Sequence, residues 1–388
     1  MKERCIPEAV IDTIHTLLHA DDTLIISTQE ELFLKKCNIM LEYFEHNKLK
    51  LNLGKSGYLV ITNDKDKRKP RLQLNKGDVQ YKKVMKYLGI LITDGGNVTK
   101  DVDLFIEEKK SHVYTKFTNY CARNFLSPLQ IKLHVLTSCI TSTLLYGCET
   151  WGKTIPKNVE QIYRVAIKTA LSIRINTNNE IVYIESGLYP LEIIVRKRQL
   201  EFWLKVKEYM NENRILRYVI ETATQHNVSY IDCYKSLEER YRTPLECEKQ
   251  IKEEYVRNFT NKIHEASVID PNSKLGAYYL VNPECNTDYK VNYQNLHELE
   301  RITMTRFRTG SHNLQIELGR HTNPITPRDQ RHCKCGNGLQ TLQHIIMDCI
   351  LLQEPRRDII ATSVKEFFEC PRAIMFIIKA SAILKIEL

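Results

Sequence analysis

The apolar pattern of the chain changes near residue 101, and this change limits the possible folds more than any other feature. Before it, short apolar runs are separated by turn residues, which is typical of β-hairpins. One exception is the segment from Leu32 to about His46, where apolar residues recur at helical spacing. After residue 101, helical spacing prevails. The 388 residues therefore predict an α+β protein of two or three domains.

Three hairpins are predicted before that change. Apolar runs flanking Asp21 and Asp22 form the first, and runs on either side of residues 75–78 form the second. The third covers residues 84–92, and residues 58–61 are predicted to form a further strand. Together with the helix, these strands predict one small sheet.

Two adjacent carboxylates, Asp21 and Asp22, stand at the tip of the first predicted hairpin. They repel each other, and no neighbour in the sequence neutralises them. A divalent cation would remove the repulsion, and carboxylate oxygens are the ligands that Mg²⁺ prefers. The alternative is a solvated turn in which the two acids have no chemical role. The pair is therefore a candidate magnesium site.

Four motifs follow one another in a characteristic order. An Ala20-Asp21-Asp22 hairpin is followed by the amphipathic helix, by Asn52-x-x-Lys55-Ser56 and by Lys86-Tyr87-Leu88-Gly89. This order resembles the last three palm motifs of the reverse transcriptases of non-LTR (LINE-type) retrotransposons. The resemblance implies the second half of a reverse-transcriptase palm in residues 1–100. It also implies RNA-directed DNA polymerase activity, with an RNA template and a DNA primer as partners.

The same resemblance implies a role for individual residues. Asp21 and Asp22 match the acids that hold Mg²⁺ for nucleotidyl transfer. Lys55 matches the lysine that assists proton transfer to the departing pyrophosphate. The Tyr87-Leu88-Gly89 segment matches the strand pair that grips the primer end.

Two features depart from the family pattern. His19 stands where an aromatic residue usually precedes Ala-Asp-Asp. A further Asp, upstream of the hairpin, completes the two-metal site of the family. It has no matching motif among residues 1–20, whose carboxylates are Glu3, Glu8 and Asp12. We therefore expect the chain by itself to lack a complete metal site and polymerase activity.

Helices are expected from residue 101 to residue 295. Residues 144–151 resemble the region downstream of the palm in these elements, which implies a helical thumb over 101–155. Residues 185–191 match a turn that family members carry, within a helical connector over 156–295. The aromatic residues of the first stretch are equally well explained as core residues.

A basic segment follows the connector. The net charge of +9 favours a polyanionic partner. Arginines gather between residues 301 and 331, in a segment that resembles the one before the zinc knuckle of LINE-type proteins. We expect Arg306, Arg308 and Arg320 to contact nucleic-acid phosphates.

Cysteine and histidine residues after this segment have the spacing of a metal site. Cys333-x-Cys335 is followed by His344 after eight residues and by Cys349 after four more. Three thiolates and one imidazole make a closed, tetrahedral Zn²⁺ site of the structural type. His332 could substitute for one ligand, and free thiols are the alternative to a metal site. The basic segment and this zinc-knuckle-like module are assigned to residues 296–388.

The remaining cysteines lack ligand spacing and are interpreted as small apolar residues in a reducing compartment. The sequence shows neither a secretory signal nor an apolar run that could cross a bilayer. We therefore expect an intracellular protein, nuclear or cytoplasmic, without a membrane segment. Two alternatives to a reverse-transcriptase fragment stay open. One is a nucleic-acid-binding zinc-knuckle protein without catalysis, and the other is a relic without a cellular role.

Overall fold

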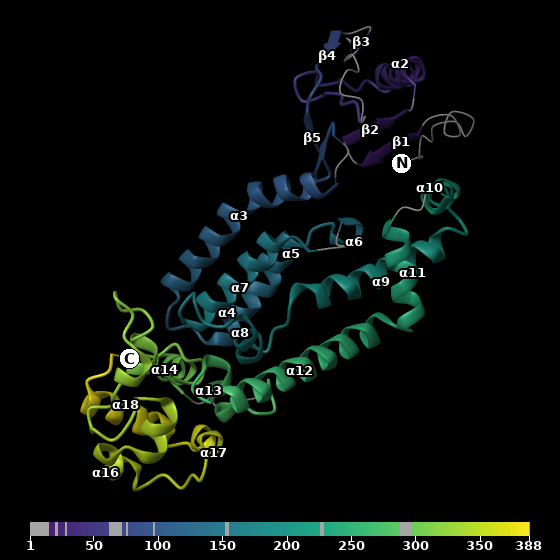
Figure 1. Ribbon diagram of the computed structural model, residues 1–388. Coiled ribbons are helices and arrows are strands. Elements are labelled where there is room, and N and C mark those ends of the chain that lie inside the picture. Colours follow the sequence, from purple (N-terminus) through teal and green to yellow (C-terminus); the bar gives the residue numbers. More distant parts are fainter. Residues whose placement is uncertain are drawn as a thin grey trace. The chain divides into compact units, whose positions relative to one another are not determined.

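The chain is a mixed α and β protein in which helices predominate, which confirms the predicted α+β class (Figure 1). It forms two compact units, Met1–Glu108 and Lys109–Leu388. The division falls inside helix α3 (Val98–Arg123), close to the change of apolar pattern. The computed structural model describes residues 15–19, 22–27, 29–61, 72–74, 77–95, 98–151, 155–225, 229–287 and 296–387.

The first predicted hairpin is present in the first unit. Strand β1 (His15–His19) pairs with β2 (Asp22–Ile26) in antiparallel register, with His19 opposite Asp22. This confirms the hairpin. Ala20 and Asp21, at its tip, lie outside the described residues.

Helix α2 (Glu30–His46) confirms the amphipathic helix predicted after the hairpin. Its inner face buries Cys37, Met40 and Leu41, at the helical spacing seen in the sequence. Cys37 and Leu41 belong to a core that also contains Tyr58, Leu72, Leu74 and Val79. Local apolar periodicity therefore sets which face of α2 is buried.

The other two predicted hairpins are also confirmed. Strand β3 (Leu72–Leu74) pairs with β4 (Gly77–Val79), and β5 (Val84–Tyr87) pairs with β6 (Ile90–Thr93). The prediction of one small sheet is wrong, because the described strands form three separate two-stranded sheets. Each strand is short and pairs only with its neighbour in the sequence.

The strand predicted over residues 58–61 is reduced to a single bridge. Tyr58 pairs with Tyr81 in parallel fashion, and no further ladder is formed by this described segment. The bridge rests on two hydrogen bonds, from the Tyr58 N–H to the Gln80 carbonyl at 3.1 Å and from the Lys82 N–H to the Tyr58 carbonyl at 2.9 Å. Tyr58 and Val60 of this segment instead pack in the same core as α2, whereas Ile61 is exposed.

The second unit is built from helices, and several of their ends are fixed by the sequence. Helix α8 begins after Asn178, whose side chain accepts hydrogen bonds from the N–H groups of Glu180 and Ile181. It ends at Ser186, and the next residue, Gly187, caps it with a φ of 62°. The helices after α3 are α4 (Leu129–Val135), α5 (Ser142–Leu144), α6 (Cys148–Trp151), α7 (Lys157–Leu171), α8 (Asn179–Ser186), α9 (Leu191–Tyr209), α10 (Arg214–Gln225), α11 (Ser229–Arg240), α12 (Pro244–Ile269), α13 (Lys274–Val281), α14 (Glu298–Arg308), α15 (Gln315–Leu318), α16 (Gln353–Arg356), α17 (Val364–Glu369) and α18 (Ala373–Leu384).

Helices α9 and α12 pack along each other, and α12 continues into contact with α13 (Figure 1). Helix α12 begins at Pro244, and the hydroxyl of Thr243 caps it by accepting the Glu246 N–H at 3.1 Å. No helix among the described residues combines the length and apolar composition needed to cross a lipid bilayer.

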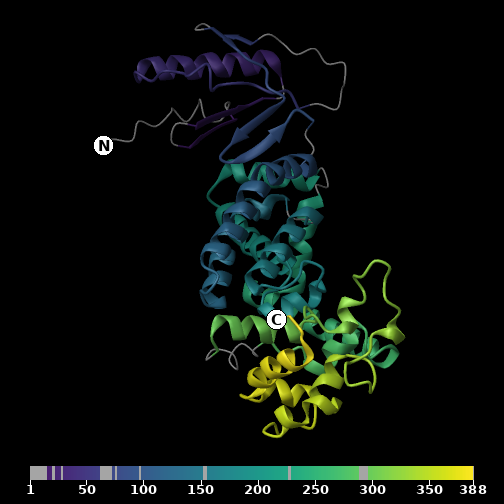
Figure 2. The same ribbon diagram turned by 90° about the vertical axis from the view of Figure 1, so that its left-hand side faces the viewer.

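The largest core of the second unit lies in its C-terminal part, where the yellow helices gather against green segments (Figure 2). It receives residues from α8, α12, α13, α14, α17 and α18. Cys333 and Cys349 are buried in the same core. The module assigned to residues 296–388 therefore shares its core with helices of the predicted connector.

Candidate metal centre

The four predicted zinc ligands come together in the structure. One ligand atom from each of Cys333, Cys335, His344 and Cys349 lies within 4.8 Å of all the others. Cys333 and Cys349 are buried, and both are free thiols. The group can hold a metal ion, because its atoms are close enough to bind one centre together.

The distances fit a small tetrahedral ion. Two sulfurs bound to zinc at about 2.3 Å would lie about 3.8 Å apart, and a sulfur and a nitrogen slightly less. The Sγ atoms of Cys333 and Cys349 are 3.7 Å apart, which is also far longer than a disulfide. The Sγ of Cys335 lies 3.2 Å from Nε2 of His344. The arrangement is therefore compatible with a structural zinc.

A tight turn presents the first two thiols. The Cys333 N–H donates to the Gly338 carbonyl at 2.9 Å, and the Gly336 N–H donates to the Cys333 carbonyl at 3.1 Å. Gly336 and Gly338 have φ values of 78° and 105°, which L side chains rarely adopt. The Asn337 N–H points at Sγ of Cys335 at 3.4 Å, a contact that favours a thiolate there.

A short helical segment supplies the other two ligands. His344 opens the turn His344–Asp348, and its N–H donates to the hydroxyl of Thr341 at 3.1 Å. The Cys349 N–H then donates back to the His344 carbonyl at 2.7 Å. The guanidinium of Arg356 fixes the end of this segment by donating hydrogen bonds to the carbonyls of Ile345, Ile346 and Cys349.

The pKa shifts of His344 and Cys335 favour the deprotonated forms that bind a metal. Burial lowers the pKa of His344, so the imidazole is neutral and can donate a lone pair near neutral pH. Burial opposes charge on Cys335, but hydrogen bonds from the Asn337 backbone and from the other two thiols outweigh it and lower its pKa. Burial raises the pKa of Cys349 to about 12. A bound cation would offset this cost, because it stabilises the thiolate directly.

His332 does not belong to the group. Its side chain is exposed, and its backbone forms a bridge to Leu339 that closes the turn carrying the first two thiols. The structure thus favours His344 as the imidazole ligand. Sequence reasoning missed Arg356, and its only signal in the sequence was a basic residue shortly after the last ligand.

The three arginines predicted to bind phosphates lie in different surroundings. Arg308 is buried, and its guanidinium binds Glu185 through Nε and a terminal nitrogen at 3.1 and 2.9 Å. Arg320 is partly exposed and pairs with Glu317 at 2.9 Å. Arg306 is half-buried, and no described carboxylate lies within ion-pair distance of it.

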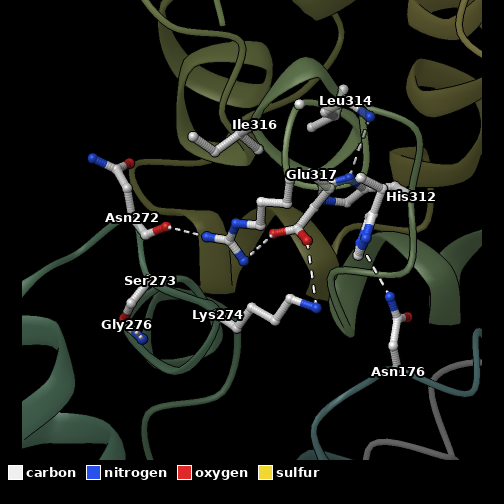
Figure 3. A network of polar contacts seen from close by, with 12 residues as sticks. Asn176, Asn272, Ser273, Lys274, Gly276, His312, Leu314, Ile316 and Glu317 are labelled. Atoms are coloured by element: carbon white, nitrogen blue, oxygen red, sulfur yellow. Dashed lines mark hydrogen bonds and ion pairs between the residues drawn. The ribbon is translucent and has the colours of Figure 1, made fainter. Parts of the chain in front are cut away.

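The pair of Arg320 and Glu317 is part of a larger network. Figure 3 shows this network around Glu317, with Asn272 and Lys274 beside it. Lys274 and Glu317 point toward each other, with Nζ and a carboxylate oxygen 3.6 Å apart. Arg320 also donates to the Asn272 carbonyl at 3.2 Å. This network joins the start of α13 to α15, so Arg320 has a structural role at this position.

The predicted palm residues lie in the first unit. Asp21 is outside the described residues, and Asp22 is the exposed first residue of β2. Within the described ranges, Asp22 belongs to no group of three or more potential metal ligands, so the structure gives no support for Mg²⁺. Lys55 is exposed in a turn, where its N–H contacts the side-chain oxygen of Asn52 at 3.2 Å.

Residues Leu88 and Gly89 connect β5 to β6. Their φ values are 47° and 83°, so both central residues of this two-residue turn have positive φ. Tyr87 is half-buried at the end of β5, and Leu88 is exposed. Primer binding by this segment stays a prediction.

Comparison with known proteins adds no relative. No protein-family model, no curated protein and no solved structure matches this chain.

Proposed function

We propose that the chain is the C-terminal part of a non-LTR (LINE-type) reverse transcriptase, an RNA-directed DNA polymerase, with a structural zinc in its C-terminal module. The observation that carries the proposal is the group Cys333, Cys335, His344 and Cys349. It has the ligand types and the spacing of a zinc site, it follows the segment that resembles LINE-type proteins, and its atoms lie within reach of one ion.

The zinc would have a structural role. Three thiolates and an imidazole fill all four positions of a tetrahedral ion, which leaves none for a substrate or water. The loop from Cys333 to Cys349 has little regular secondary structure, and two of its ligands are buried in the core. The ion would therefore hold this loop against α17 and α18.

For the palm half, the proposal assigns Asp21 and Asp22 to Mg²⁺, Lys55 to proton transfer toward pyrophosphate, and the Tyr87-Leu88-Gly89 segment to the primer end. Two features of the first unit support it: an exposed Asp22 at the start of β2, and an exposed Lys55 in a turn. Two-metal transfer needs acids on both ions. We therefore also propose that this chain by itself does not extend a primer.

Nucleic-acid binding without catalysis is the second candidate, and two observations favour it. The chain carries a net charge of +9, and Arg306 has no carboxylate partner among the residues whose placement is described. Arg308 and Arg320 are already engaged by Glu185 and Glu317. We therefore place the predicted phosphate contact of this segment on Arg306.

Two assays test the proposal. The purified chain is given an RNA template, an annealed DNA primer, Mg²⁺ and nucleotides, and we expect no extension. Extension that disappears with Asp21→Ala would show that the site is complete. In a binding assay with the same nucleic acid, log K should fall with log salt by about 0.7–0.9 per phosphate contacted. The absence of binding at low salt would contradict both candidate functions.

A further inference from the structure

The second unit contains a cavity of about 450 Å³ between the end of α7 and α14. Three cationic side chains line it: Lys168 and Arg174, on either side of the helix end, and Arg306 from α14. Glu387 is the one carboxylate among the lining residues, and its side chain is exposed. A volume of this size is within the range of small-molecule sites, which is about 300–1,000 Å³.

The three cations have no ionic partner within the described part of the chain. The C-terminus of α7 offsets them only in part, because a helix end carries about half a negative charge. The Nζ of Lys168 donates to the Ile175 carbonyl at 2.7 Å and to the side-chain oxygen of Asn179 at 2.8 Å. Both acceptors are neutral, so the ammonium charge is not compensated.

Lys168 and Arg306 keep donor groups that bind no described acceptor. Arg306 uses its Nε for the Ser172 carbonyl, at 3.0 Å, and no described acceptor binds its two terminal nitrogens. Arg174 is held by its N–H bond to the Ser311 hydroxyl, at 2.8 Å, and by a bond from its guanidinium to Asn313. Lys168 uses two of its three N–H groups, which leaves one.

Burial and neighbouring positive charges disfavour the charged forms of two of these cations. Burial, together with Arg164 and Lys274, lowers the pKa of Lys168 to about 8. Burial, together with Arg174 and Arg301, also lowers the pKa of Arg306. Uncompensated buried charges are costly unless a partner of opposite sign joins them. Among the described lining residues the exposed Glu387 is the one carboxylate, so it faces three cations and does not balance them.

His312, which also lines the cavity, adds no fourth charge. Burial lowers its pKa to about 3, so the imidazole is neutral near neutral pH. Its Nδ1 accepts the Leu314 N–H at 3.4 Å (Figure 3). A neutral ring whose Nδ1 accepts carries its proton on Nε2. The ring is thus a neutral hydrogen-bond donor.

We infer that this cavity binds a phosphate group, held by Lys168, Arg174 and Arg306. Guanidinium groups match the oxygens of phosphate with two parallel hydrogen bonds, and a lysine adds a point charge. The phosphate can come from a nucleic-acid backbone or from a free phosphorylated molecule, since both present the same oxygens. This inference extends the phosphate contact that the proposed function places on Arg306, and it can fail separately, because inorganic phosphate can bind whether or not the chain binds nucleic acid.

The test uses the full, metal-loaded chain and inorganic phosphate, titrated calorimetrically at constant ionic strength against chloride. Loss of a charge-assisted contact should weaken binding about tenfold or more in Arg306→Gln. The matched control is Arg328→Gln, which removes the same charge from an exposed pair with Asp270 outside the cavity. It should leave the affinity within about twofold. Glu387→Gln should strengthen binding, because it removes a competing negative charge.

Arg306→Lys keeps the positive charge and should retain part of the affinity for phosphate. Circular dichroism of both Arg306 variants checks that they fold, so that weaker binding can be assigned to the site. A short single-stranded RNA then identifies the source of the phosphate. If the RNA displaces phosphate and binds less tightly to Arg306→Gln, the cavity takes a backbone phosphate. If it leaves bound phosphate in place, the cavity takes a free phosphorylated molecule. No heat above chloride for the wild type, or equal weakening in Arg306→Gln and Arg328→Gln, would overturn the inference.

Discussion

Arg308 of α14 and Glu185 of α8 form a buried, two-point ion pair whose side chains are 5% and 0% exposed. The hydroxyl of Tyr278 also donates to the same carboxylate at 2.8 Å, and the guanidinium lies over the ring of Phe368. Residues far apart in the sequence are thereby fixed to each other inside the largest core. Arg308 thus supports the fold in a region that the sequence had suggested for phosphate contact.

Arg308→Met should destabilise the second unit by about 3–5 kcal/mol, because it leaves Glu185 buried without its cation. Arg320→Met should cost less than Arg308→Met, because Arg320 is partly exposed and the buried carboxylate of Glu317 keeps Lys274 as a second cation at 3.6 Å. Denaturant unfolding followed by circular dichroism measures both. Replacing Glu185 by Leu together with Arg308→Met should recover part of the loss. Equal costs for the two single variants would contradict the structural role of Arg308.

The turn between β5 and β6 is strained at Leu88, which has a φ of 47°. Large side chains are disfavoured there, whereas asparagine tolerates this conformation. Leu88→Asn should therefore stabilise the β5–β6 hairpin by about 1 kcal/mol. Leu88→Val should destabilise it, because a β-branched residue is least suited to positive φ. Hydrogen exchange of the hairpin amides, measured by mass spectrometry, reports the change locally. If both substitutions changed the stability of the hairpin in the same direction, strain at Leu88 would not explain the effect.

Acid should destabilise the second unit through His312. Burial lowers its pKa to about 3, whereas in the unfolded chain it titrates near 6.5. Between these values the unfolded state binds the extra proton, so the free energy of unfolding falls as the pH falls. The slope for one proton is at most about 1.4 kcal/mol per pH unit. His312→Asn should reduce the slope between pH about 6.5 and 5, whereas His264→Asn, at an exposed position, should not. Identical slopes in wild type and His312→Asn would contradict the assignment.

Much of the local structure could be predicted from sequence, because it depends on neighbours in the chain. The hairpin flanking Asp21 and Asp22, and helix α2, follow from alternating and helical apolar spacing. The metal group followed from ligand types and intervals, since a small loop leaves few ways to place Cys333, Cys335, His344 and Cys349.

The rest depends on contacts that spacing does not encode. Arg306 and Arg308 are two residues apart, yet one lines a cavity and the other is paired in the core. Their partners are Ser172, which follows α7, and Glu185 of α8, both more than a hundred residues earlier in the chain. Dependence on distant contacts also explains why the prediction of one sheet is wrong. Each hairpin can be predicted from neighbouring residues, but joining the hairpins into one sheet needs pairing between distant strands. The described strands pair only with their neighbours in the sequence.

Metal content of the full chain tests the account most directly. Protein purified without chelator should carry one zinc per chain, measured by native mass spectrometry and elemental analysis. Cys349→Ser should abolish it, whereas Cys370→Ser, outside the ligand group, should retain it. Since binding of a structural zinc contributes about 10–16 kcal/mol in zinc-finger peptides, a strong chelator should also loosen residues 333–349 in hydrogen exchange. Wild-type protein without stoichiometric zinc, or zinc that persists in Cys349→Ser, would contradict the account.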